Sequence, residues 1–288
     1  MTLKNNNNLF DFDEEQRNHC FNSKEIASID NQSLTTKSKP RNDVVIIGTD
    51  EAGRGPGAGG VFASAVYFNS LDEDLINKLS ALNDSKKLSK KTRESLYEII
   101  LKNTINSTVC IEVEEIEKIN ILNASLKAMK LAVENVIKEI NASNVALNLI
   151  QGRRVVRLCD PESSSGRRES LKNILVLVDG NKLIKDLNYS TTQPLNPSTT
   201  IHQKCIVKGD SKSASIAAAS ILAKVSRDRY MEELDKKFPQ YNWIKNAGYL
   251  TAEHLKAIDK YGITPIHRKT FLRKHFEKNI QQKLELVN

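Results

Sequence analysis

Four acidic residues stand at the ends of short, mostly apolar runs of this 288-residue chain: Asp50, Glu51, Asp179 and Asp210. If these runs are neighbouring β-strands, their ends bring the four carboxylates together at one edge of a sheet. Four like charges repel one another unless cations neutralise them, and oxygen ligands without His or Cys favour Mg²⁺ or Mn²⁺ over zinc. Two such ions about 3.5–4 Å apart could stabilise both the attacking and the leaving oxygen of a phosphoryl displacement.

Each acid also has a simpler interpretation. Asp179 with the following glycine and asparagine is typical of a turn, and Asp210 could cap a helix that starts after it. Asp50 and Glu51 are harder to explain in this way, because adjacent acids at a buried strand end are costly without a partner. We therefore interpret the four acids together as a metal site.

The segment that follows the acid pair, 52–60 (AGRGPGAGG), is rich in glycine and carries one arginine. Glycine lets the backbone approach a ligand closely. Exposed N–H groups and the guanidinium of Arg54 suit phosphate. A metal site beside phosphate-binding groups points to phosphodiester chemistry.

The elements that must position these residues follow from the apolar patterns. β-Branched and apolar runs predict strands at 44–49, 61–68, 107–113, 174–178 and 204–208. Periodic spacing predicts helices at 89–103, 120–140 and 211–238, of which the last begins with small side chains that permit close approach to the sheet. A run of strands followed by alternating helix and strand predicts an α/β fold with a mixed sheet.

Composition divides the chain into three parts. Residues 1–42 are rich in Asn, Ser and Asp, which predicts a disordered polar extension. Residues 43–238 form the predicted catalytic domain, and the helical, basic residues 239–288 form a C-terminal subdomain. Residues 141–173 are polar and rich in arginine, which suggests an insertion that either contacts phosphate or is a solvated loop.

The net charge of +8 lies entirely in residues 201–288, which hold 17 Lys/Arg and 9 Asp/Glu. A localised basic surface is typical of nucleic-acid binding, with a solvated lysine-rich surface as the alternative. The four cysteines are far apart, which argues against a zinc knuckle or a disulfide framework and fits a reducing cytosol. No run approaches the ~18 apolar residues of a membrane span, and the polar N-terminus does not resemble a signal peptide. We therefore expect a cytoplasmic protein without a membrane partner.

Six segments closely resemble those of ribonuclease HII, and they occur in the same order. They are 49–56 (TDEAGRGP), 84–89 (DSKKLS), 178–181 (VDGN), 208–211 (KGDS), 217–225 (AAASILAKV) and 265–269 (PIHRK). The resemblance implies an RNase H-like fold, a mixed five-stranded sheet flanked by helices with a small helical C-terminal subdomain. It also implies an endonuclease that hydrolyses the RNA strand of RNA–DNA hybrids and nicks 5′ to ribonucleotides embedded in duplex DNA. The implied products are a 3′-hydroxyl and a 5′-phosphate.

The resemblance also assigns roles to individual residues. It implies that the four acids bind two Mg²⁺ or Mn²⁺ ions and catalyse hydrolysis, with Asp50 bridging both ions. The backbone of Gly53, Arg54 and Gly55 would read the ribose 2′-hydroxyl, the group that distinguishes RNA from DNA. The resemblance further implies that Tyr249 stacks on a deoxyribose of the substrate. It also implies phosphate contacts, with ordinary surface charge as the alternative, for Lys86, Lys87, His267 and Arg268.

Two departures from the family pattern lie near these residues. Leu250 stands where the family has proline, and we expect this to free the backbone after Tyr249. The turn at 56–60 carries extra glycine where the family tends to have leucine and proline, which adds chain entropy beside the site.

Other interpretations fit less of the sequence. The related ribonuclease HIII has a separate N-terminal substrate-binding domain, for which forty polar residues are too few. A glycine-loop nucleotide-binding protein would have a Gly-Lys-Ser/Thr loop, which is absent here. A non-catalytic nucleic-acid-binding protein would use only the basic C-terminal third. We expect a monomer whose tail, 281–287, loosely resembles peptides that dock on sliding clamps, with a frayed helix end as the alternative.

Overall fold

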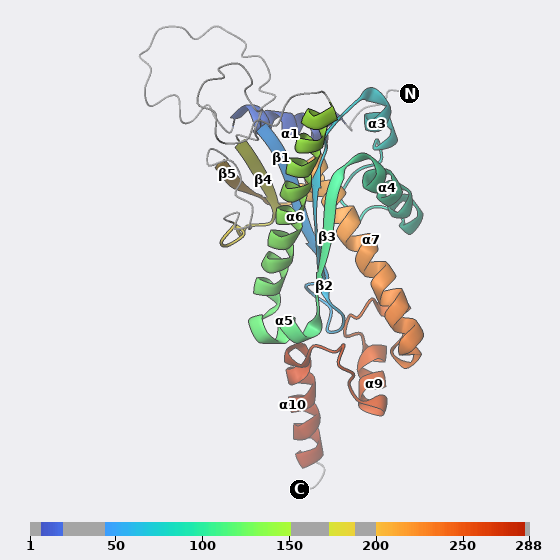
Figure 1. Cartoon of the computed structure of the whole chain (residues 1–288). Helices are drawn as coiled ribbons and strands as arrows, with labels where there is room; N and C mark the ends of the chain where they lie inside the picture. Colours follow the sequence, from blue (N-terminus) through green and yellow to red (C-terminus); the bar gives the residue numbers. More distant parts are fainter. Residues whose placement is uncertain (1–6, 20–43, 151–172, 188–199, 286–288) are drawn as a thin grey trace.

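A five-stranded mixed sheet forms the centre of the computed structural model, which describes residues 7–19, 44–150, 173–187 and 200–285 (Figure 1). The strands are β1 (Val44–Ala52), β2 (Val61–Tyr67), β3 (Ile105–Ile111), β4 (Asn173–Asp179) and β5 (Thr200–Ile206). They lie in the order β3-β2-β1-β4-β5. Strands β2 and β3 extend the sheet in antiparallel fashion, whereas β4 and β5 run parallel to β1. The predicted mixed five-stranded sheet is confirmed.

The register of the parallel strands brings the acids to one level. Thr49 of β1 pairs with Val178 of β4, so that Asp50 and Asp179 are the next residues on two adjacent strands. Asp179 in turn pairs with Ile206 of β5, a few residues before Asp210. The three strand ends therefore meet at the same edge of the sheet.

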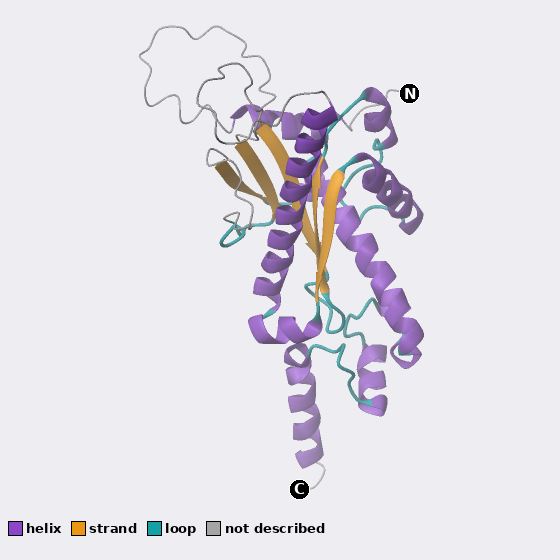
Figure 2. Ribbon diagram, viewed as in Figure 1, coloured by secondary structure: helices purple, strands orange, loops and turns teal. Residues whose placement is uncertain are grey.

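Helices cover both faces of the sheet (Figure 2). They are α1 (Asn7–His19), α3 (Glu73–Lys78), α4 (Lys90–Asn103), α5 (Val113–Ile119), α6 (Ile121–Ile150), α7 (Ala214–Lys237), α8 (Trp243–Asn246), α9 (Ala252–Tyr261) and α10 (Lys269–Glu285), with the short 3₁₀ turns η1 (Gly209–Ser211) and η2 (Pro239–Tyr241). Helix α6 packs on one face, and α1, α4 and α7 pack on the other. Among the described residues, no helix has the length and apolar character needed to cross a bilayer.

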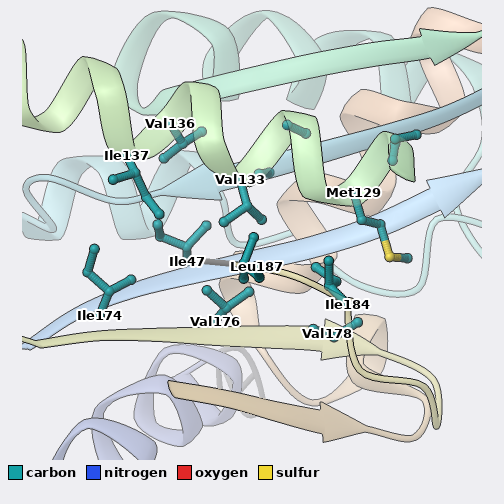
Figure 3. Packing of buried hydrophobic residues seen from close by; sticks show 14 of the residues in the cluster. Ile47, Met129, Val133, Val136, Ile137, Ile174, Val176, Val178, Ile184 and Leu187 are labelled. Atoms are coloured by element: carbon teal, nitrogen blue, oxygen red, sulfur yellow. The ribbon is translucent and has the colours of Figure 1, made fainter. Parts of the chain in front are cut away.

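The core beneath α6 shows why β1 and β4 are almost entirely apolar. Side chains of α6, such as Val133 and Ile137, meet Ile47 of β1 and Val176 of β4 (Figure 3). The alternate residues of the same strands, such as Ile46, face the opposite cluster. Strands that are buried on both faces read as continuous hydrophobic runs, as these two do.

Helix α7 lies very close to the central strand. A Cβ atom on Gly48 of β1 would be 2.2 Å from the backbone carbon of Ser215. Only glycine fits at such a contact, and the run of alanine and serine at the start of α7 supplies the matching surface. Helix α7 thus runs beside β1 at backbone contact distance.

The prediction of disorder before residue 43 is wrong for residues 7–19, which form α1. Leu9 and Phe10 are buried, and the Phe10 ring meets Phe68 edge-on at 5.6 Å. The buried carboxylate of Asp13 accepts a hydrogen bond from the backbone N–H of Ser215 at 2.9 Å. These contacts are tertiary, and the polar composition of the segment gave no local sign of them. Residues 1–6 and 20–43 lie outside the described part.

Several element boundaries differ from the predicted ones. The helix predicted at 120–140 continues to Ile150, into the segment assigned to the insertion, and 151–172 lie outside the described residues. Strand β3 ends at Ile111, and Val113 already belongs to α5. Helix α4 begins where predicted, because the Ser89 side chain accepts a hydrogen bond from the Thr92 backbone N–H. The predicted clamp-binding tail, 281–287, falls mostly beyond the side chains that the structure describes.

Helices α8 and α9 gather around the end of α7 and the glycine-rich segment. One buried cluster joins Ala58 of that segment and Met231 of α7 to Trp243, Ile258 and Leu272. The C-terminal helices therefore contact the segment that follows the acid pair, and they share a core with α7.

Candidate active site

The four predicted acids lie at the carboxyl ends of their strands. Asp50 is in β1 and is 6% exposed, Glu51 follows it, Asp179 ends β4 and Asp210 lies in η1. The Asp50 carboxylate accepts a hydrogen bond from the Glu51 backbone N–H at 2.7 Å. The Asp179 carboxylate accepts one from the Gly209 backbone N–H at 2.6 Å. This bond ties the end of β4 to the turn that carries Asp210.

The charge of Asp179 raises the pKa of the other three acids. Burial raises the pKa of Asp50 well above its ordinary value, and the charges of Glu51 and Asp179 raise it further. Burial also raises the pKa of Glu51, against the influence of Arg54, whose guanidinium lies 3.1 Å from its carboxylate. The pKa of Asp210 is raised by burial, then by Asp84 and Asp179. The four acids therefore form one electrostatically coupled group.

This group has the chemistry of a site for divalent cations. Its donors are carboxylate oxygens only, and their mutual repulsion is what a hard cation would relieve. Within the described ranges, no three acidic, His or Cys side chains already surround a common ion position. Carboxylate oxygens of the four acids instead accept hydrogen bonds from protein groups, as the Asp179 carboxylate does from the Gly209 N–H.

Two further residues join the acids, and the sequence interpretation did not assign them to the site. Asp84 lies close enough to Asp210 to raise its pKa. Ser220 of α7 lies close enough to Asp50 to lower its pKa, and the Ser220 hydroxyl oxygen lies 3.0 Å from that of Ser85. The segment 84–89 was identified in the sequence, but nothing in its local pattern indicates that it lies near Asp50 or Asp210.

The glycine loop (residues 53–60) is closely packed. A Cβ atom on Gly57 would lie 2.6 Å from the side chain of Leu250, and one on Gly60 would lie 2.6 Å from the Cys110 sulfur. Gly59 has φ +84° and faces the sulfur of Met231 at the same distance. Neighbouring side chains therefore occupy the space that larger residues would need at these three positions.

Tyr249 lies over the glycine loop and is 52% exposed. A Cβ atom on Gly55 would be 3.2 Å from its ring. The Tyr249 backbone N–H donates to the Asn246 carbonyl at 2.8 Å, and its own carbonyl accepts from the Thr251 N–H at 2.8 Å and lies 2.9 Å from Nδ1 of His254. Hydrogen bonds on both sides therefore hold the backbone of Tyr249 with leucine at position 250.

The four residues predicted to contact phosphate divide into two pairs. Lys86 and Lys87 are exposed, and Lys86 lies close enough to Asp210 to lower its pKa. His267 and Arg268 are 1% and 0% exposed, so the structure contradicts their assignment as phosphate contacts. Their polar character suggested the surface, but both side chains bind other buried groups.

His267 belongs to a buried network of rings. Its Nε2 lies 3.1 Å from Nε2 of His254, which accepts a hydrogen bond from Trp243 at 3.1 Å. Its Nδ1 accepts from the Thr264 backbone N–H at 2.9 Å. Burial and the neighbouring His254 lower the pKa of His267 to about 4, so the ring is neutral at physiological pH. It therefore supports the turn around Tyr249 and carries no charge for a phosphate.

Comparison with known proteins gives a consistent result. A family model described as Ribonuclease HII matches residues 47–279. Ribonuclease HII of Rickettsia akari is 42% identical over 81% of this chain and 94% of its own length, and that of Rickettsia canadensis is 40% identical over 83% and 95%. The crystal structure of ribonuclease H2 from Pyrococcus horikoshii is 23% identical, with a TM-score of 0.50 over 78% of this chain and 93% of that one, which bears on the fold alone. The chain therefore belongs to the ribonuclease HII family, which cleaves RNA in RNA–DNA hybrids and at embedded ribonucleotides.

Proposed function

We propose that the four carboxylates hold divalent metal ions while the chain cleaves its substrate, and that cleavage leaves a 3′-hydroxyl and a 5′-phosphate. The observation that carries this proposal is the meeting of the four carboxylates at one edge of the sheet, where the charge of Asp179 also raises the pKa of the other three. Bound Mg²⁺ or Mn²⁺ would supply Lewis-acid chemistry, activating water and stabilising the leaving oxygen.

The surrounding residues hold the acids in place for this task. The Glu51 N–H holds the Asp50 carboxylate, and the Gly209 N–H holds that of Asp179. Because oriented ligands lose less freedom when they bind an ion, these contacts favour metal binding once the side chains turn toward a common ion.

Substrate recognition falls to the glycine loop and its neighbours. Gly53, Arg54 and Gly55 lie directly after the acid pair, and the exposed ring of Tyr249 lies against Gly55. This arrangement supports backbone recognition of the ribose 2′-hydroxyl with Tyr249 stacking on the adjacent sugar. Lys86 and Lys87, on the other side of Asp210, are available for the phosphates.

The test is cleavage of a DNA duplex that contains one ribonucleotide, with Mg²⁺ or Mn²⁺ as the only added metal. Asp50→Asn keeps the shape of the side chain and removes its charge, and we expect it to lower the cleavage rate at least about a hundredfold. Asp13→Asn is the matched control, because it neutralises another buried acid away from the site and should leave the rate within about twofold. Equal rates for Asp50→Asn and the wild type would refute the assignment.

A further inference from the structure

Two buried arginines lie beneath the glycine loop. Arg227 of α7 is 2% exposed and Arg268 is 0% exposed. Within the described part of the chain, neither side chain is within ion-pair distance of a carboxylate. Burial lowers the pKa of Arg268 to about 10, which still leaves it charged at neutral pH. Unpaired buried charges are costly, so their retention calls for a physical reason.

Arg268 binds the backbone carbonyls of the loop from below. Its Nη2 donates to the carbonyl of Gly53 at 2.8 Å and its Nη1 to that of Arg54 at 3.3 Å. Its Nε and Nη2 donate to Gly59 at 2.9 and 2.7 Å, and Nη2 also reaches Gly60 at 3.2 Å. One planar guanidinium therefore holds both ends of the loop through their carbonyls.

Arg227 of α7 binds the same loop at a third point. Its Nη2 donates to the carbonyls of Ala58 at 3.2 Å and Ala247 at 3.0 Å, which joins the loop to the turn before Tyr249. Its Nε has no hydrogen-bond partner in the described structure, and a Cβ atom on Gly53 would lie 2.3 Å from it. Position 53 therefore requires glycine, because its φ is +100° and a side chain there would overlap the Arg227 side chain.

The inward carbonyls determine where the amide N–H groups point. In a planar trans peptide the C=O of one residue and the N–H of the next point in opposite directions, and the described chain has no cis peptide bond. Because Arg268 draws the carbonyls of Gly53 and Arg54 inward, the N–H groups of Arg54 and Gly55 point away from it. No described residue accepts a hydrogen bond from either of these N–H groups. They are two adjacent free donors beside the ring of Tyr249.

We propose that Arg268 and Arg227 are positioning residues for ribose recognition. They turn the carbonyls of the glycine loop inward, so that the N–H groups of Arg54 and Gly55 face the ribose of the substrate. Their uncompensated positive charge lies behind these donors and favours an electron-rich ligand in front of them. This inference rests on the proposed role of the glycine loop in reading the 2′-hydroxyl.

The test compares binding to two duplexes of the same sequence, one with a single ribonucleotide and one of DNA alone. All proteins carry Asp50→Asn, and Mg²⁺ is present, so that binding is measured without cleavage. Arg268→Lys keeps the charge, but an ammonium cannot serve four carbonyls in the way that a planar guanidinium does. We expect it to lower the ratio of the two affinities about tenfold or more, with affinity for the all-DNA duplex changed less than about twofold.

Arg229→Lys is the control, because Arg229 is an exposed arginine of α7, the helix that carries Arg227, and it pairs with Glu94 and Glu98. It should leave the ratio unchanged. An unchanged ratio in folded Arg268→Lys, or an equal loss of affinity for both duplexes, would overturn the proposal. Cleavage by the Asp50→Asn protein would instead count against the assignment of the acids.

If Arg268→Lys does not fold, the proposal can be tested in a protein that keeps Arg268 and Arg227. Amide hydrogen exchange of Arg54 and Gly55, followed by NMR in the Asp50→Asn protein, should be fast in the free state. We expect at least about tenfold slower exchange with the ribonucleotide duplex than with the all-DNA duplex. Equal exchange with the two duplexes would overturn the proposal.

Discussion

Replacing Asp50 with asparagine should stabilise the metal-free protein even as it removes activity. Asp50 is 6% exposed, and its pKa is raised by burial and by the charges of Glu51 and Asp179. Asparagine keeps the size and the acceptor oxygen that binds the Glu51 N–H, but it removes the repelled charge. The same substitution removes one of the proposed ligands for the metal ions.

The register of β1 and β4 sets the size of the effect. Asp50 and Asp179 are at the same level on adjacent strands, which lie about 4.8 Å apart. Two charges at about 5 Å repel by about 3 kcal/mol at an effective dielectric constant of about 20. We expect Asp50→Asn to raise the free energy of unfolding by about 1.5–3 kcal/mol at pH 8, since solvent near the strand ends screens part of this repulsion. The melting temperature should rise by roughly 3–10 °C.

Urea and thermal unfolding in EDTA at several pH values would measure this gain. Because the folded protein raises the pKa of Asp50, the wild type binds this proton more tightly when folded and loses stability as pH rises above about 4. Asp50→Asn lacks this loss, so its advantage should grow with pH. Added Mg²⁺ at a hundred times its dissociation constant should stabilise the wild type by about 2.7 kcal/mol and stabilise the variant far less.

Two results would refute this reasoning. Lower stability of Asp50→Asn than of the wild type in EDTA at pH 8 would mean that repulsion among the acids is not the dominant effect of the site. An equal gain from Mg²⁺ in both proteins would mean that Asp50 is not a ligand. Asp13→Asn is the control for the second result, because it removes a distant buried charge and should keep the full response to Mg²⁺.

Three further predictions concern other parts of the chain. Burial raises the pKa of Asp13 to about 6. The free energy of unfolding of the wild type, measured in urea, should therefore fall by about 3 kcal/mol relative to that of Asp13→Asn as pH rises from about 4 to about 6; parallel pH profiles would contradict this. Tyr249→Ala should reduce kcat/KM at a single ribonucleotide while changing the free energy of unfolding by less than about 1 kcal/mol, because the ring is half exposed; a rate equal to that of the wild type would show that the ring does not take part. Gly60→Ala should destabilise the protein by about 1–3 kcal/mol, because its methyl group would overlap the Cys110 sulfur and the Ile111 carbonyl; unchanged urea unfolding would mean that the loop yields easily.

Local patterns in the sequence were enough to predict the sheet and to find its acids. Strand β4 has an unbroken apolar run at 174–178 that is followed by Asp179, and both features can be read from consecutive residues. Helix α1 could not be found in this way, because it is held by Phe68 and Ser215, which are far from it in sequence. The family model begins at residue 47, so the resemblance did not reveal this helix either.

Buried charge was the other source of error. The resemblance implied that Arg268 contacts phosphate, and the alternative was an ordinary surface charge, so both interpretations placed it at the surface. Its actual partners are backbone carbonyls of a loop some two hundred residues earlier, and carbonyls leave no mark on the sequence. The proximity of Asp84 to Asp210 was also missed, because the two residues are far apart in the sequence and neither local pattern points to the other.

The contact between Gly57 and Leu250 has a consequence for how this chain can vary. The leucine side chain occupies the space that any side chain at position 57 would need. The Leu250 side chain thus fills the space beside position 57 from the opposite side. Gly57→Leu alone would overfill this space, and Leu250→Pro alone would leave part of it empty. We therefore expect the two substitutions to be coupled, with a double variant that is destabilised less than the sum of the two single variants.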